Sequence, residues 1–71
     1  MKNEKSVFES GDEFRCVEFY DVDPDESGVE IFLDTKLLGR INGISIPPID
    51  DEEENNEFDK KVIEWIRDNA L

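Results

Sequence analysis

The chain of 71 residues has no histidine and only one cysteine, Cys16. Without histidine there is no imidazole to act as a general base or to bind a metal. A single cysteine cannot form a disulfide within the chain, and it cannot by itself supply a structural zinc site. We therefore expect no enzyme activity, no metal and no other cofactor. Cys16 is interpreted either as a small residue of a strand, in the core or on a sheet face, or as a reactive thiol beside Arg15.

Long hydrophobic runs are also missing, since no more than three apolar residues follow one another. A transmembrane helix needs about 20 such residues, and a secretory signal needs an apolar core of about 7 or more. The sequence therefore predicts a protein of the reducing cytoplasm, which is the host cytoplasm if the protein is viral, with no membrane contact.

Basic residues are scarce, because 8 lysines and arginines stand against 20 aspartates and glutamates, for a net charge of −12. Nucleic acids and anionic membranes attract basic proteins, so we expect no direct binding to either. A basic surface on another protein is the partner that this charge favours.

The apolar residues are few but patterned, and the pattern predicts one small α+β domain over residues 13–71, preceded by a loosely ordered arm over residues 1–12. Residues 13–22 are rich in β-branched and aromatic side chains, which favour a strand, although the inward face of this strand is ambiguous. Residues 29–34 alternate, with Val29, Ile31 and Leu33 on one face and Phe32 on the other. Turn-forming residues between the two runs, Pro24 among them, predict an antiparallel hairpin.

A third strand-like run covers residues 37–46 and allows two structures. In one, it is a single bent strand with a bulge at Gly43. In the other, Asn42 and Gly43 form a tight turn that divides the run into two short strands. The expected antiparallel sheet accordingly has three strands or four.

A C-terminal amphipathic helix is predicted over residues 57–71, packed on one face of the sheet. Its apolar side chains recur at helical spacing and form one stripe. The stripe consists of Phe58, Val62, Trp65 and Ile66.

The segment DVDPDESGVE, residues 21–30, resembles the start of a calcium-binding loop, because Asp21, Asp23 and Asp25 alternate. An EF-hand loop also needs glycine at the place of Glu26 and a bidentate glutamate at the place of Phe32. Both flanks of the segment predict strands, whereas an EF-hand loop joins two helices. We interpret the segment as a hairpin turn and expect no specific calcium site.

Negative charge is concentrated in residues 21–36 and 50–57, which together supply eleven of the twelve excess charges. In an extended chain, alternating aspartates would project on one side about 6.6 Å apart, twice the rise of a strand. Such a row would resemble a row of phosphates. Glu30 and Asp34 are expected to prolong it on the neighbouring strand.

These clusters lead to the hypothesis of a DNA-mimic decoy: a small non-enzymatic inhibitor that occupies the basic, nucleic-acid-binding surface of a partner, for example a host defence nuclease. Its size and acidity are typical of decoys encoded by viruses and mobile elements. Two alternatives stay open, an immunity protein or antitoxin against a basic toxin, and an interaction domain whose acids only confer solubility. The candidate partner-binding residues are Asp21, Asp23, Asp25, Glu26, Glu30, Phe32, Asp34, Asp51, Glu52, Glu53 and Glu54.

Phe32 is the one apolar candidate. It is expected to point away from the helix and to serve as an interface anchor, since aromatic side chains within a polar rim dominate many binding energies. The alternatives are that Val7 and Phe8 of the arm cover it, or that a second copy of the chain does so in a homodimer.

Overall fold

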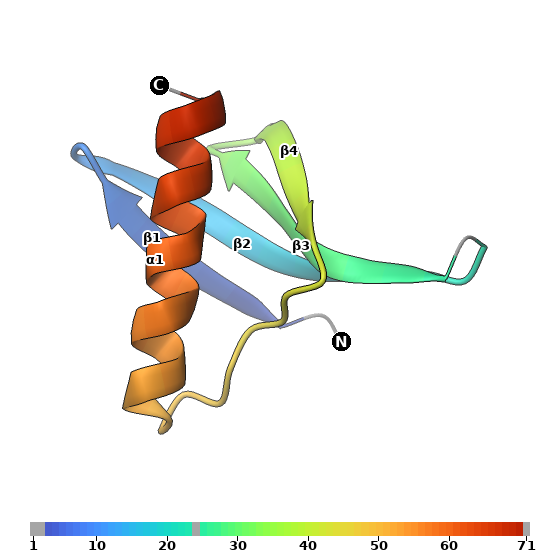
Figure 1. Ribbon diagram of the computed structural model, residues 1–71. Helices are drawn as coiled ribbons and strands as arrows, with labels where there is room; N and C mark the ends of the chain where they lie inside the picture. The colour runs from blue at the N-terminus through green and yellow to red at the C-terminus, as the bar shows by residue number, and fades with distance from the viewer. Residues whose placement is uncertain (1–2, 24, 71) are drawn as a thin grey trace.

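The computed structural model describes residues 3–23 and 25–70 of the chain. Its elements are β1 (Glu4–Glu9), β2 (Asp12–Asp21), β3 (Glu26–Leu33), β4 (Lys36–Asn42) and α1 (Glu52–Asn69). The strands form one antiparallel sheet in the order β1-β2-β3-β4, and α1 lies across one face of it (Figure 1). The predicted α+β class, an antiparallel sheet with one C-terminal helix, is confirmed.

The fourth strand lies at the N-terminus, where the sequence predicted a loose arm. β1 pairs with β2 without interruption, from Glu4 opposite Val17 to Glu9 opposite Asp12. The turn between the strands uses Ser10 and Gly11, both with positive φ. The sequence pattern missed β1 because this strand carries a single apolar residue on each face, which is too little for an alternating signal.

β4 ends at Asn42, so both structures expected for residues 37–46 are wrong. Gly43 has a φ of +83°, and its N–H donates to the carbonyl of Ser27 at 2.8 Å, after which the chain leaves the sheet. The irregularity in pairing lies instead within β4, where its register against β3 shifts between Ile31 and Phe32.

β2 and β3 form the predicted hairpin, paired from Phe14–Leu33 to Asp21–Glu26. β1 pairs with β2 only as far as Val17, and β4 pairs with β3 only as far as Gly28. The end of the hairpin therefore projects from the body of the domain as a two-stranded arm (Figure 1). We call residues 20–27 the acidic arm; Pro24, expected in its turn, lies outside the described residues.

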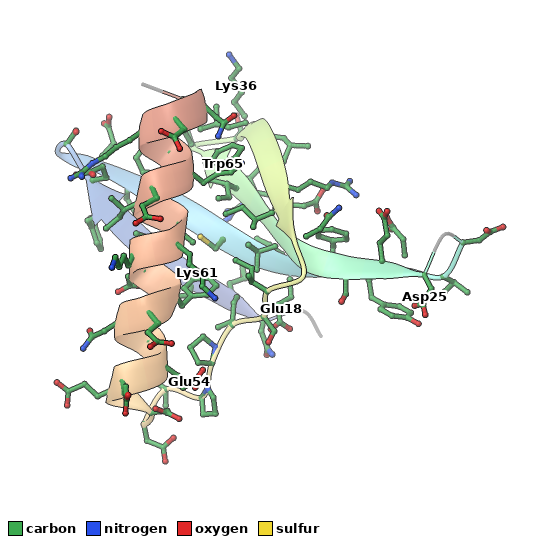
Figure 2. The ribbon with its side chains drawn as sticks, in the orientation of Figure 1. Glu18, Asp25, Lys36, Glu54, Lys61 and Trp65 are labelled. Carbon is green, nitrogen blue, oxygen red and sulfur yellow. The ribbon has the colours of Figure 1, made fainter. Side chains whose placement is uncertain are left out.

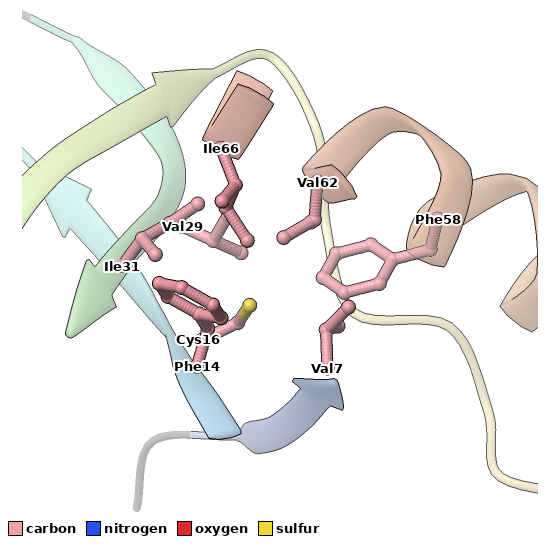
Figure 3. Close-up of a cluster of buried hydrophobic side chains, with 8 residues drawn as sticks. All are labelled: Val7, Phe14, Cys16, Val29, Ile31, Phe58, Val62 and Ile66. Atoms are coloured by element: carbon pink, nitrogen blue, oxygen red, sulfur yellow. The ribbon is translucent and has the colours of Figure 1, made fainter. Parts of the chain in front are cut away.

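One apolar cluster fills the space between the sheet and the helix (Figure 3). The face of β2 that carries Phe14 and Cys16 points toward α1, which resolves the ambiguity left by the sequence. Val29 and Ile31 lie on the helix side of β3, as predicted. The cluster consists of Val7, Phe14, Cys16, Val29, Ile31, Phe58, Val62 and Ile66.

Trp65 is only half-buried, although the sequence predicted it in the same stripe as the core residues. Its ring lies against β4 at Gly39, where an added methyl group would come within 2.6 Å of a ring carbon. Gly39 thus makes room for the indole at the edge of the core.

α1 begins at Glu52, five residues before the predicted start. Asp51 caps it, because its carboxylate accepts the backbone N–H of Glu54 at 3.1 Å. The first turn contains Glu52, Glu53 and Glu54, where negative charge interacts favourably with the positive end of the helix dipole. We call residues 50–54 the helix-start cluster.

Candidate functional site

The candidate residues do not form one surface. Figure 2 shows Asp25 at the end of the acidic arm and Glu54 in the first turn of α1, at separate ends of the molecule. A third group lies on the sheet face that α1 leaves uncovered, which we call the open face.

The acidic arm ends in an exposed turn. β2 stops at Asp21, so Asp21, Asp23 and Asp25 do not form the extended row that the sequence predicted. Asp23 and Asp25 lie in the turn and Glu26 begins β3, all three exposed. The Tyr20 hydroxyl donates a hydrogen bond to Asp25 Oδ1 at 2.8 Å, which raises the pKa of Tyr20. Among the described residues, no salt bridge engages the three carboxylates of the turn.

Asp21 and Glu30, on the open face, are held by an arginine of this chain. Arg40 Nη1 lies 3.2 Å from Asp21 Oδ2, and Arg40 Nη2 lies 3.3 Å from Glu30 Oε2. The guanidinium also stacks over the ring of Phe19, 4.3 Å from its centroid. Both carboxylates are therefore partly neutralised. Asp34 lies beyond the other end of β3, between β3 and β4 at a φ of +57°, so it does not prolong an acidic row from the arm.

Phe32 lies on the open face, on the side of β3 opposite the core, as predicted. β2 lies between Phe32 and β1, so Val7 and Phe8 of β1 do not cover Phe32. The Arg15 guanidinium lies over its ring instead, 5.2 Å from the centroid, and Leu37 is its neighbour on β4. Phe32 is half-buried, whereas Phe8 is 67% exposed.

Cys16 is fully buried in the core cluster. Burial raises the pKa of its thiol to about 12, with a smaller contribution from the negative charge of Asp59. A thiol in this state does not ionise at neutral pH and is not nucleophilic. Of the two interpretations of Cys16, the core residue is the one that its burial supports.

A groove that the sequence did not indicate opens between the start of β1 and the segment that joins β4 to α1. It encloses about 520 Å³ and is lined by residues 3–5, residues 46–49 and Asn55. Its apolar wall consists of Ile46, Pro47, Pro48 and Ile49. No sequence signal could have revealed it, because the lining comes from three segments that only the fold brings together.

Within residues 3–23 and 25–70, no three acidic or cysteine side chains are grouped so as to hold a metal ion. The described part of the chain likewise contains no helix that is long and apolar enough to cross a membrane. Comparison with protein-family models, with curated proteins and with solved structures finds no match to this chain. Its function is therefore inferred from its own surfaces.

Proposed function

We propose that the protein is a non-enzymatic cytoplasmic inhibitor that inserts its acidic arm into the basic, nucleic-acid-binding surface of a partner protein, as a DNA-mimic decoy. The observation that carries the proposal is the placement of Asp23, Asp25 and Glu26 at the end of a projecting hairpin. An arm of two strands can enter a groove that the whole domain cannot, because β1 and β4 stop pairing before the arm begins.

Electrostatics supports the arm over the other acidic residues. Asp23, Asp25 and Glu26 form no salt bridge among the described residues, and their attraction for a basic surface extends over about 8 Å at physiological salt. By contrast, Arg40 offsets Asp21, at the base of the arm, and Glu30 on the open face. Asp51 and the glutamates that follow it stabilise the start of α1, which gives them a role within the fold.

A second candidate is an interaction domain that binds through the open face, with acids that only confer solubility. Phe8 and Leu37 are exposed on this face, and Arg15 stacks on Phe32 between them. Aromatic and arginine side chains are the most frequent anchors of protein interfaces. An immunity protein or antitoxin would also bind its partner through the acidic arm. The identity of the captured partner distinguishes this function from that of a DNA-mimic decoy.

Neutralising the arm is expected to weaken partner binding at least tenfold, which corresponds to about 1.4 kcal/mol. The variant combines Asp23→Asn, Asp25→Asn and Glu26→Gln, which removes three charges and keeps side chains that suit the turn. The partner is captured from lysate at low salt, purified, and titrated with each variant by calorimetry.

The matched control combines Glu52→Gln, Glu53→Gln and Glu54→Gln, which removes the same charge from the helix-start cluster and leaves the Asp51 cap in place. This control variant is expected to lose less affinity for the partner than the arm variant does. If the arm variant binds like the unmodified protein while Phe32→Ala loses affinity, the open face is the binding surface and the decoy proposal is wrong.

A further inference from the structure

The outer edge of β1 carries backbone groups that no strand pairs within the described residues, since β1 stands at one end of the sheet. The hydrogen bond from the Glu18 N–H to the Asn3 carbonyl, 3.0 Å long, fixes the phase of the β1–β2 ladder. Bonded and non-bonded pairs alternate in an antiparallel ladder. The backbone N–H and C=O groups of Glu4, Ser6 and Phe8 therefore point away from β2, toward the open edge.

The two edges of the sheet differ in regularity. β4 has a register shift against its neighbour, and such irregularities hinder the addition of a further strand. β1 keeps one register over its whole length. An inward-pointing lysine on an edge strand usually discourages pairing, because a further strand would bury its charge. The charge of Lys5 is already paired on the helix side. Its Nζ lies 2.7 Å from Asp59 Oδ1 and 2.6 Å from Asn55 Oδ1. β1 thus offers a regular template for another strand.

The groove described above opens at the start of this same edge, because residues 3–5 form one of its walls. Figure 1 shows the segment between β4 and α1 passing the beginning of β1. Ile49, on the apolar wall, is 99% exposed and contributes nothing to the core. An apolar side chain from a bound strand would cover it and would bury the two neighbouring prolines.

The charge around the groove indicates what kind of strand fits. The helix-start cluster follows Ile49 directly and precedes Asn55, so acidic residues adjoin the groove on the side of α1. Glu4 lies in the lining itself. An extended segment with alternating apolar and basic side chains fits all three features. Its backbone would bond the edge of β1, its apolar side chains would contact the apolar wall, and its basic side chains would pair with the acidic residues.

We infer that the β1 edge and its groove bind such a segment of the partner protein, which adds to the sheet as a fifth strand beside β1. This inference rests on the proposed function, because it takes the partner to be basic. The acidic arm attracts and orients the partner, and the β1 edge holds a strand of it by backbone hydrogen bonds.

The first test uses a synthetic peptide of eight residues in which lysine and valine alternate, with both ends blocked. In the protein alone, the amide protons of Glu4, Ser6 and Phe8 should exchange rapidly with solvent. At saturation with the peptide they should exchange at least about tenfold more slowly, as expected for newly bonded strand amides. The amide protons of Lys5 and Val7 already bond β2 and should change little.

A peptide that alternates lysine and proline has the same charge but favours the polyproline II helix, whose three residues per turn do not place every second carbonyl against β1, and it should give no such protection. Equal binding of both peptides, without slowed exchange, would mean that charge alone acts and would overturn the inference. Protection of the three amides in the protein alone, together with a dimer in sedimentation, would show that a second copy fills the edge and would also overturn it.

Two variants carry the test to the captured partner. Ser6→Pro removes an N–H that faces the open edge, together with the exposed hydrogen bond that Ser6 Oγ donates to Glu13 Oε2. Proline is tolerated at such positions of edge strands. Ile49→Ser removes the exposed apolar side chain of the groove without touching the sheet, so it remains informative if Ser6→Pro fails to fold. Each should weaken binding at least about fivefold, whereas Leu37→Ser, which changes an exposed apolar residue of β4, should not.

These variants also separate the inference from the proposed function. Loss of affinity on neutralising the arm, with full affinity for Ser6→Pro and Ile49→Ser, would leave the decoy in place and refute strand addition. The reverse pattern would keep the β1 edge as the binding surface and refute the role of the arm.

Discussion

Replacing Phe14 by alanine is expected to lower the free energy of unfolding by about 3–5 kcal/mol. Phe14 is 1% exposed and is the largest of the fully buried side chains, so its removal leaves a cavity between β2 and α1. A chain of this length has a total stability of about 4–11 kcal/mol. The loss is a large fraction of this total, so the urea concentration at the midpoint of unfolding, followed by far-ultraviolet circular dichroism, should fall steeply.

Phe32→Ala is the matched control, because it makes the same change on the neighbouring strand but on the open face. Phe32 is half-buried and packs mainly under Arg15, so we expect a loss of about 1 kcal/mol or less. A larger loss for Phe32→Ala than for Phe14→Ala would place the core on the other face of the sheet and contradict the fold.

Cys16 is expected to react with iodoacetamide at least about 1000-fold more slowly in the folded protein than in urea at pH 8, because its thiol is protonated and its side chain is fully buried. Burial raises the pKa of the thiol from 9.0 to about 12, and each unit lowers the population of the reactive thiolate about tenfold. Mass spectrometry of quenched samples gives both rates. The Phe14→Ala variant should react faster than the unmodified protein, because its core opens more often, and this links the measurement to the first.

The raised pKa of Cys16 also makes the stability of the fold depend on pH. Folding raises the pKa of Cys16, so it favours the neutral thiol. The resulting stabilisation is complete below pH 9 and is lost as the pH rises toward about 12. Rapid alkylation of the folded protein at pH 8 would show that the thiol is ionised and accessible, and would restore the reactive-cysteine interpretation.

The hairpin of β2 and β3 was predictable because local chemistry specifies it. Both strands carry β-branched and aromatic residues, and the segment between them is composed of residues that favour turns. The helix was predictable for a similar reason, since Phe58, Val62 and Ile66 follow its period and all three are buried. Its start was placed too late because the glutamates of the first turn carry no apolar signal.

Tertiary contacts decide the features that the sequence did not reveal. β1 is a strand because Val7 joins the core and Lys5 is held by α1, neither of which is a local pattern. The pairing of Arg40 with Asp21 and Glu30 depends on three strands lying side by side. The sequence alone placed these carboxylates among free acids, whereas the sheet brings an arginine to them.

The affinity of the purified partner, measured from about 50 to about 500 mM salt and again with a DNA duplex as competitor, tests the central claim most directly. Long-range attraction between the acidic arm and a basic surface is screened by salt. We predict a steep loss of affinity as salt rises, a shallower slope once the charges of Asp23, Asp25 and Glu26 are removed, and displacement of the protein by the duplex. Affinity that is independent of salt, in a complex that binds the duplex at the same time, would contradict the decoy function.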